Sequence, residues 1–202
     1  MTTPSLSQRL RNETAAQHER MHALMAQADP FASRERYAQF VAAQYVFQRD
    51  VEHFFADPQV QGAVPDLAVR GRAAATLTDL ADLDAMDKVV PAQDVATRAV
   101  KMPEALGWLY VSEGSTLGAA FLFKEVGEKL GLSATFGARN LAAYPEGRAR
   151  VWKRFVEALD APALVPAQDQ VIAGALAAYA RFGQLLEQQF ALRTDAGASA
   201  AA

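Results

Sequence analysis

The chain contains no cysteine, and this absence removes several kinds of chemistry at once. Disulfides, thiolate metal sites and cysteine nucleophiles are all excluded. A cysteine-free chain is typical of a reducing compartment, so a cytoplasmic location is expected. The polar N-terminus MTTPSLSQRLRNE lacks the hydrophobic segment of a secretory signal. The chain also lacks any run of about 18 uncharged apolar residues, so no membrane span is expected.

An excess of charge of one sign is missing too, because the formal net charge is only −3. Such weak acidity gives no general attraction to nucleic acid or to anionic membranes, and neither partner is expected. Hydrophobic residues make up 51% of the chain and charged residues 21%, which is ordinary for a globular protein. The 202 residues are enough for one domain with a sizeable core, and a monomer is the simplest expectation.

Alternating strand patterns are not found, and nearly every segment repeats its apolar residues at three and four positions. This spacing predicts an all-α fold, a single compact domain of about seven or eight helices over residues 1–193, followed by a disordered tail over 194–202. The expected helices cover residues 5–28, residues 33–57, a third from residue 66, a short piece between prolines 91 and 103, residues 103–130, and two more that open at prolines 145 and 166.

Local signals predict where several of these helices begin and end. The S-x-x-Q pattern at Ser5 is a capping box. Ser33 and Asp66 are candidate N-caps, and Pro103 suits the first position of a helix. Gly131 suits a left-handed C-cap.

Histidine is scarce, so each of the three, His18, His22 and His53, is weighed as a ligand. On a helical wheel His18 lies at the margin of the apolar stripe. It is either a half-buried histidine bonded to a backbone carbonyl or a ligand. Arg11 lies about 10 Å before it along a straight helix, so the pair could hold the iron and a propionate of one haem. Otherwise Arg11 is a solvated side chain, His22 lies on a polar face, and His53 supplies charge near a helix end.

The segment LYVSEGSTLGAAFLF, residues 109–123, carries two glycines inside a predicted helix. Each glycine weakens a helix by about 1 kcal/mol relative to alanine. Around Gly114, one strip of the helix gathers mostly small or flat side chains: Gly107, Tyr110, Val111, Gly118 and Phe121. The strip indicates either close packing of another helix or close approach of a flat ligand to the backbone.

The sequence of residues 109–119, LYVSEGSTLGA, resembles the distal-helix signature of the bacterial biliverdin-forming haem oxygenases. This branch includes iron-acquisition enzymes and the enzymes paired with bacteriophytochromes. The stretch RLRNETAAQH, which ends at His18, is similar to the family's first helix, where a basic residue, an acidic residue and a threonine precede the haem-ligating histidine. Length and all-α layout agree with the family over about residues 5 to 192.

The resemblance implies an enzyme that binds haem as substrate and cleaves it, with O2 and external electrons, to biliverdin, carbon monoxide and ferrous iron. It implies that His18 is the axial ligand of the haem iron and that Gly114 and Gly118 lie over the opposite haem face. Glycine there leaves room for oxygen above the ring. An ordered water network, with Ser115 as a minor candidate, is expected to supply protons. A reductase or ferredoxin is the implied electron donor.

The resemblance also suggests residues that hold the rest of the haem. Arg11 and Tyr110 are expected to bind the propionates, and Val111 lines the same strip. Phe182 is the best match for an aromatic ring that the family's C-terminal helix presents to haem. Further basic residues are candidates that the sequence does not assign: Lys124, Lys129, Arg139 and Arg150.

Three alternatives remain open, of which one is a purely structural or partner-binding bundle. A non-enzymatic haem carrier or sensor would use the same binding residues. A di-iron carboxylate bundle would use Glu19-x-x-His22 and Asp50-x-x-His53 with bridging glutamates from the later helices. The candidate bridging residues are Glu104, Glu113, Glu125 and Glu128.

Overall fold

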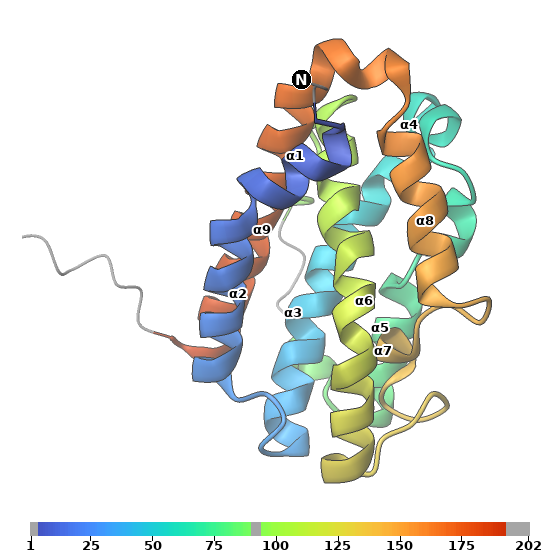
Figure 1. Cartoon of the computed structure of the whole chain (residues 1–202). Helices are drawn as coiled ribbons and strands as arrows, with labels where there is room; N and C mark the ends of the chain where they lie inside the picture. Colours follow the sequence, from blue (N-terminus) through green and yellow to red (C-terminus); the bar gives the residue numbers. More distant parts are fainter. Residues whose placement is uncertain (1–3, 90–93, 193–202) are drawn as a thin grey trace, which may run out of the picture.

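The computed structural model describes residues 4–89 and 94–192, and this part is built from helices (Figure 1). It contains nine α-helices and four short 3-10 helices, with no strand beyond isolated bridges, so the all-α prediction is confirmed. The α-helices are α1 Leu6–Glu13, α2 Ala15–Ala28, α3 Arg34–Glu52, α4 Pro58–Ala63, α5 Ala73–Asp82, α6 Glu104–Leu130, α7 Arg139–Ala142, α8 Arg148–Leu159 and α9 Gln168–Phe190. The 3-10 helices are His53–Ala56, Leu67–Arg70, Met86–Lys88 and Pro162–Ala167.

The first predicted helix is divided into two at Thr14. The buried Thr14 hydroxyl donates a hydrogen bond to the Leu10 carbonyl at 2.7 Å, and the Thr14 backbone leaves helical geometry with φ −103° and ψ 5°. Such bonding of threonine back onto its own helix commonly bends the chain. Figure 1 shows the resulting change of direction between α1 and α2. Arg11 and His18 therefore lie on different helices, and the straight-helix separation expected for them does not apply.

Three of the predicted helix ends are confirmed. The capping box at Ser5 is formed, and the Ser33 hydroxyl accepts a hydrogen bond from the Arg36 amide. Gly131 ends α6 in the left-handed region with φ 68°.

Other predicted boundaries are wrong. Asp66 makes no side-chain cap, because a 3-10 turn and Gly71 separate it from α5. Pro103 precedes α6 rather than opening it. Residues 94–102 form turns instead of a short helix, and Pro91 lies outside the described residues. The helix expected from Pro145 begins three residues later, at Arg148. The predicted tail over 194–202 also lies outside the described residues.

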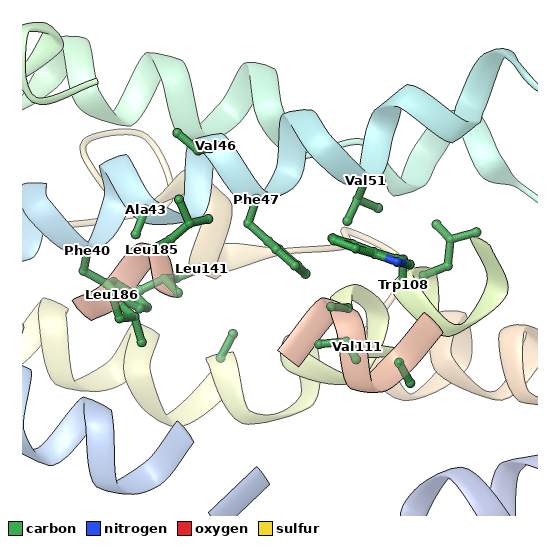
Figure 2. Close-up of a cluster of buried hydrophobic side chains, with 14 of the residues drawn as sticks. Phe40, Ala43, Val46, Phe47, Val51, Trp108, Val111, Leu141, Leu185 and Leu186 are labelled. Atoms are coloured by element: carbon green, nitrogen blue, oxygen red, sulfur yellow. The ribbon is translucent and has the colours of Figure 1, made fainter. Parts of the chain in front are cut away.

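Helix α9 forms the base on which the other long helices pack. It contacts α6 most extensively and also packs against α1, α2 and α3. Aromatic rings join these helices in one core. The Phe47 ring lies 6.1 Å from Trp108 of α6 (Figure 2). It also lies 5.3 Å from Phe182 of α9. Burying each large apolar side chain contributes about 1.5–3 kcal/mol, so α3, α6 and α9 make a firm frame.

Two glycines let α6 and α9 approach each other closely. A Cβ atom added to Gly107 would lie 2.0 Å from the Val171 carbonyl oxygen, and one added to Gly174 would lie 2.1 Å from the Glu104 oxygen. Only glycine fits at such separations from another backbone. The helix-packing interpretation of the glycine strip is therefore correct at its first position, Gly107.

Within the described ranges, no helix combines the length and the apolar character needed to cross a membrane.

Candidate functional site

Two histidines lie one turn apart on α2. His18 and His22 are both exposed, and their ring centroids are 4.6 Å apart with an interplanar angle of 70°. Met21 and Leu24 of the same helix pack on α9, where a Cβ atom at Gly183 would lie 3.1 Å from Met21 and 3.4 Å from Leu24. Neither histidine ring makes a hydrogen bond within the described residues. The half-buried, carbonyl-bonded interpretation of His18 is thus wrong.

The glycine strip of α6 becomes open toward the middle of the helix. A Cβ atom at Gly114 would meet only the Trp152 ring, at 3.6 Å, and one at Gly118 would have nothing within 4 Å. Leu117, which lies between them, is 38% exposed, and Phe121, which follows them, is 80% exposed. Helix packing therefore does not account for Gly114 and Gly118, although it accounts for Gly107 on the same strip.

A cation from α1 and a phenol from α6 lie within electrostatic reach of each other. Burial raises the pKa of Tyr110 to about 12, with a further increase from Tyr179, while the positive charge of Arg11 acts in the opposite direction. Tyr110 is therefore a neutral hydroxyl at physiological pH. Arg11 is exposed and has no ion-pair partner within the described residues. The two side chains thus offer a positive charge and a hydrogen-bond donor from neighbouring helices.

The remaining predicted site residues lie at varied depths. Val111 is buried in the cluster of Figure 2. Phe182 is half-buried against Phe40 and Phe47, with ring centroids 6.4 Å and 5.3 Å away. Ser115 is exposed, and its hydroxyl donates a hydrogen bond at 2.6 Å to the carbonyl of the residue three before it.

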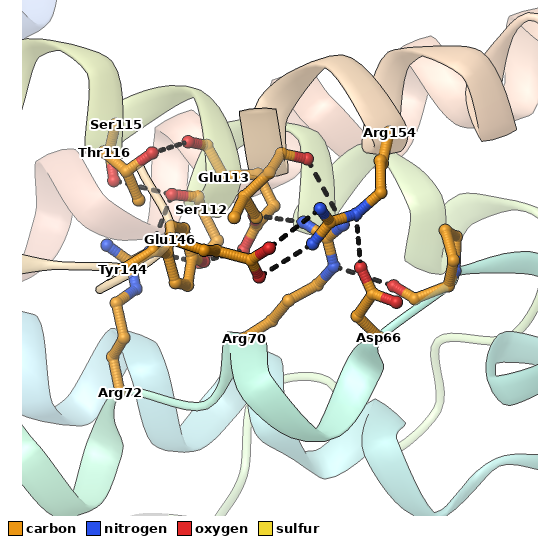
Figure 3. A network of polar contacts seen from close by, with 12 residues as sticks. Asp66, Arg70, Arg72, Ser112, Glu113, Ser115, Thr116, Tyr144, Glu146 and Arg154 are labelled. Carbon is orange, nitrogen blue, oxygen red and sulfur yellow. Dashed lines mark hydrogen bonds and ion pairs between the residues drawn. The ribbon is translucent and has the colours of Figure 1, made fainter. Parts of the chain in front are cut away.

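Glu113, the acidic residue inside the glycine segment, is turned into the protein. It is 1% exposed and forms an ion pair with Arg70 at 2.5 Å, while the Tyr144 hydroxyl donates to its other oxygen at 2.7 Å (Figure 3). Burial raises the pKa of Tyr144 as well. A buried carboxylate requires such partners, because unpaired charge is very costly away from water. The Glu113 side chain therefore lies on the buried side of α6 and not on the strip of Gly114 and Gly118.

A second arginine fixes the same segment of α6. Arg72 donates to the Ser112 carbonyl at 2.7 Å and to its hydroxyl at 2.8 Å; both residues are labelled in Figure 3. That hydroxyl in turn donates to Gln48 at 3.2 Å. Arg148 supports the next turn by donating to the Thr116 carbonyl at 3.0 Å. These groups anchor the glycine-rich turns from behind, so the open strip is held on a rigid element.

Sequence reasoning missed these anchoring residues. The signal that could have found them is Glu113 itself, since a carboxylate in an otherwise buried apolar helix requires a cation. The chain offers many arginines, and only the tertiary structure selects Arg70, Arg72 and Arg148.

The four unassigned basic residues now differ in availability. Arg139 pairs with two aspartates of α5. Lys124 and Lys129 each pair with a glutamate one turn away. Arg150 is exposed and has no ion pair within the described residues. Of the four, Arg150 is therefore the one whose charge is not paired within the described residues.

The di-iron alternative is wrong. Within residues 4–89 and 94–192, no group of three or more histidine, aspartate or glutamate side chains is placed to hold a metal ion. Asp50 is fully buried and pairs with Arg181 at 3.0 Å and Arg49 at 3.3 Å, so it serves the core instead.

The helical architecture is that of the haem oxygenases. The fold matches the NO- and CO-bound haem oxygenase structure from Neisseria meningitidis with a TM-score of 0.87 and 37% identity over 96% of each chain. It also matches haem oxygenase 2 from Chlamydomonas reinhardtii, solved without haem, with a TM-score of 0.77 over 95% of this chain and 100% of that one. That second pair shares 15% identity, so it bears on the fold alone.

Sequence comparison then gives the family. The Heme oxygenase family model matches residues 4–188. Over 188 residues the chain is 47% identical to heme oxygenase PigA of Pseudomonas aeruginosa. The aligned region covers 92% of this chain and 93% of that protein. The chain therefore belongs to the haem oxygenase family, and the resemblance seen in the two sequence motifs is confirmed.

Proposed function

We propose that this chain binds haem as its substrate and opens the ring to biliverdin, carbon monoxide and ferrous iron. The observation that carries the proposal is a pair of open surfaces on two helices held by α9. The α2 surface presents an exposed imidazole, His18, and the α6 surface presents Gly114 and Gly118 with no backbone against them. Family membership supports the same activity.

The residues present fit a haem. Iron accepts imidazole nitrogen readily, and the His18 ring is accessible and unbonded within the described residues. Neither Gly114 nor Gly118 carries a side chain, and of the two only Gly114 has another side chain nearby, the Trp152 ring, so a flat ring can approach the backbone most freely at Gly118. Exposed Leu117 and Phe121 offer apolar surface beside that strip, of the kind that marks a ligand site on a soluble protein.

Arg11 and Tyr110 are the groups that we assign to the propionates. A guanidinium pairs well with a carboxylate, and the hydroxyl of Tyr110 keeps its proton because its pKa is about 12. Hydrogen bonds to a charged acceptor are stronger than neutral ones. Val111 and Phe182 are assigned to the walls of the same site, behind the open surface.

When bound, haem supplies the ring that is oxidised and the iron at which oxygen reacts. The chain's own part is to hold that ring by His18 and to leave space on the α6 side, where any larger side chain would intrude. Glu113 is paired with Arg70 and is not available as a proton donor at the strip. The Ser115 hydroxyl hydrogen is engaged with its own helix, so its oxygen can accept from water but its proton is not free. We therefore assign proton delivery to ordered water at the strip.

Electrons come from a separate donor in this proposal, because the sequence carries no flavin-binding motif and no cysteine for an iron–sulfur cluster. A reductase or a ferredoxin is the partner implied. We further propose that residues 1–193 act as one domain, as a monomer, in the cytoplasm.

The test is a visible spectrum of the purified chain mixed with haemin, followed by addition of a reductant in air. Loss of the Soret band with growth of a bilin band is expected. His18→Ala should weaken iron ligation and stop turnover. His53→Ala, which alters an exposed histidine at the far end of α3, is the matched control and should behave as wild type.

Two results would count against the proposal. A haem spectrum that stays stable under reductant and air would support a carrier or sensor instead of an oxygenase. If haem ligation is unchanged in His18→Ala, the assignment of His18 as the iron ligand is wrong.

A further inference from the structure

We propose that, in the haem-free protein, His18 and His22 together form a binding site for one divalent transition-metal ion of the Zn²⁺ or Cu²⁺ class. The two residues are four apart on α2, so they lie on the same face in successive turns. Their ring centroids are 4.6 Å apart and both side chains are exposed. The site is distinct from the iron site of haem, although it shares one ligand with it.

The chemistry of the pair suits such an ion. Neutral imidazole is a good ligand for zinc, copper and nickel, and two histidines at i and i+4 of a helix are a recurrent zinc-binding arrangement. Neither ring makes a hydrogen bond within the described residues, so no existing bond must be broken to bind the ion. The rings now meet edge to face at an interplanar angle of 70°, and exposed rings can rotate to aim one nitrogen each at a common ion.

The backbone beneath the pair is already ordered. Helix α2 spans Ala15–Ala28, and Met21 and Leu24 hold it on α9. Binding therefore costs little ordering of the main chain, and the second imidazole acts at a high effective concentration once the first has bound. No third histidine, aspartate or glutamate is placed to join within the described residues, so water completes the coordination and the affinity is modest.

Sharing His18 has a consequence that rests on the proposed function. One imidazole cannot ligate the haem iron and another metal ion at the same time. Free Zn²⁺ or Cu²⁺ should therefore compete with haem for the apoprotein, and His22 should be needed for that competition but not for haem binding itself.

The first experiment titrates ZnCl2 into the tag-free, haem-free full chain by isothermal calorimetry. Wild type should bind one Zn²⁺ per chain. His18→Ala and His22→Ala should each weaken binding by about tenfold or more, because each removes the chelate. His53→Ala is the matched control and should bind as wild type. Alanine favours helix, so the variants should fold, and their circular dichroism checks this.

The second experiment repeats the haemin titration with Zn²⁺ present. Zinc should raise the apparent Kd for haemin in wild type and leave it unchanged in His22→Ala, which should still form bilin. If His22→Ala binds Zn²⁺ as tightly as wild type, the proposed metal site is wrong, whatever the result of the haemin titration. If zinc binds as expected but no variant or wild type binds haemin, the metal site stands and the proposed haem function fails.

Discussion

Replacing Gly118 by alanine should make the haem-free protein more stable and the enzyme less active. Gly118 lies in the interior of α6, and an added Cβ atom would meet nothing within 4 Å. The new methyl group therefore clashes with nothing in the folded chain and reduces the freedom of the unfolded one. The same methyl would occupy the space that we assign to the haem face.

The magnitude follows from the helix position. Alanine is more favourable than glycine in a helix interior by about 0.5–1 kcal/mol. For a chain of this size, 1 kcal/mol shifts Tm by roughly 2–4 °C, so Gly118→Ala should raise Tm by about 1–4 °C. Turnover of haemin should fall by about tenfold or more, equivalent to roughly 1.4 kcal/mol in the barrier.

Two other glycines of α6 supply matched controls. At Gly127 an added Cβ would make an ordinary contact of 3.5 Å with the Leu132 oxygen, so Gly127→Ala should gain similar stability without loss of turnover. At Gly107 the Cβ would lie 2.0 Å from the Val171 oxygen of α9. Gly107→Ala must push two helices apart and should cost about 3 kcal/mol, because the clash is with backbone that cannot rotate away.

The assays are thermal unfolding of the apoproteins by circular dichroism at 222 nm and bilin formation from haemin under reductant. Full turnover in Gly118→Ala would refute the placement of the haem face on this strip. A lower Tm in Gly118→Ala would refute the structural claim that the position is open.

Three further predictions concern other groups of the chain. Arg70→Met leaves Glu113 buried without its cation, so the free energy of unfolding in urea should fall by about 3–5 kcal/mol; an unchanged midpoint would contradict the buried pair. The Arg154 guanidinium, which donates two hydrogen bonds to Glu146, holds the pKa of that carboxyl below its ordinary value of 4.5. The stabilisation by this ion pair is complete above the ordinary pKa and is lost as pH falls through the lowered value, so Glu146→Gln should reduce Tm at about pH 7 and the difference from wild type should shrink as pH falls below 4.5. Tyr110→Phe should weaken haemin binding by about tenfold or more, measured by Soret titration, since a hydrogen bond to a charged acceptor contributes about 1.5–3 kcal/mol; equal affinity would remove Tyr110 from the propionate site.

Local chemistry let the sequence predict much of the fold. The apolar spacing of three and four gave the all-α class, and the ends at Ser5, Ser33 and Gly131 follow from side-chain caps and from a left-handed glycine, which act within a few residues. The predictions failed where a distant contact or a bend decided the outcome. Thr14 divides the first helix in a buried setting, and Asp66 is separated from α5 by a turn that no local pattern indicated.

The candidate site divides in the same way. His18 and the segment of residues 109–119 could be singled out as candidates from their residues alone, because a scarce histidine and two glycines inside a predicted helix are visible in the sequence. Gly107 and Gly118 look alike in that sequence, yet one meets the backbone of α9 and the other meets open space. The sequence likewise indicates that a buried Glu113 requires a cation. That this cation is Arg70 depends on how the Leu67–Arg70 turn packs on α6. Sequence thus determined which groups are available, and tertiary packing alone decided which of them are buried against a neighbour and which are left free for a ligand, since both outcomes depend on what lies a few ångströms away in space.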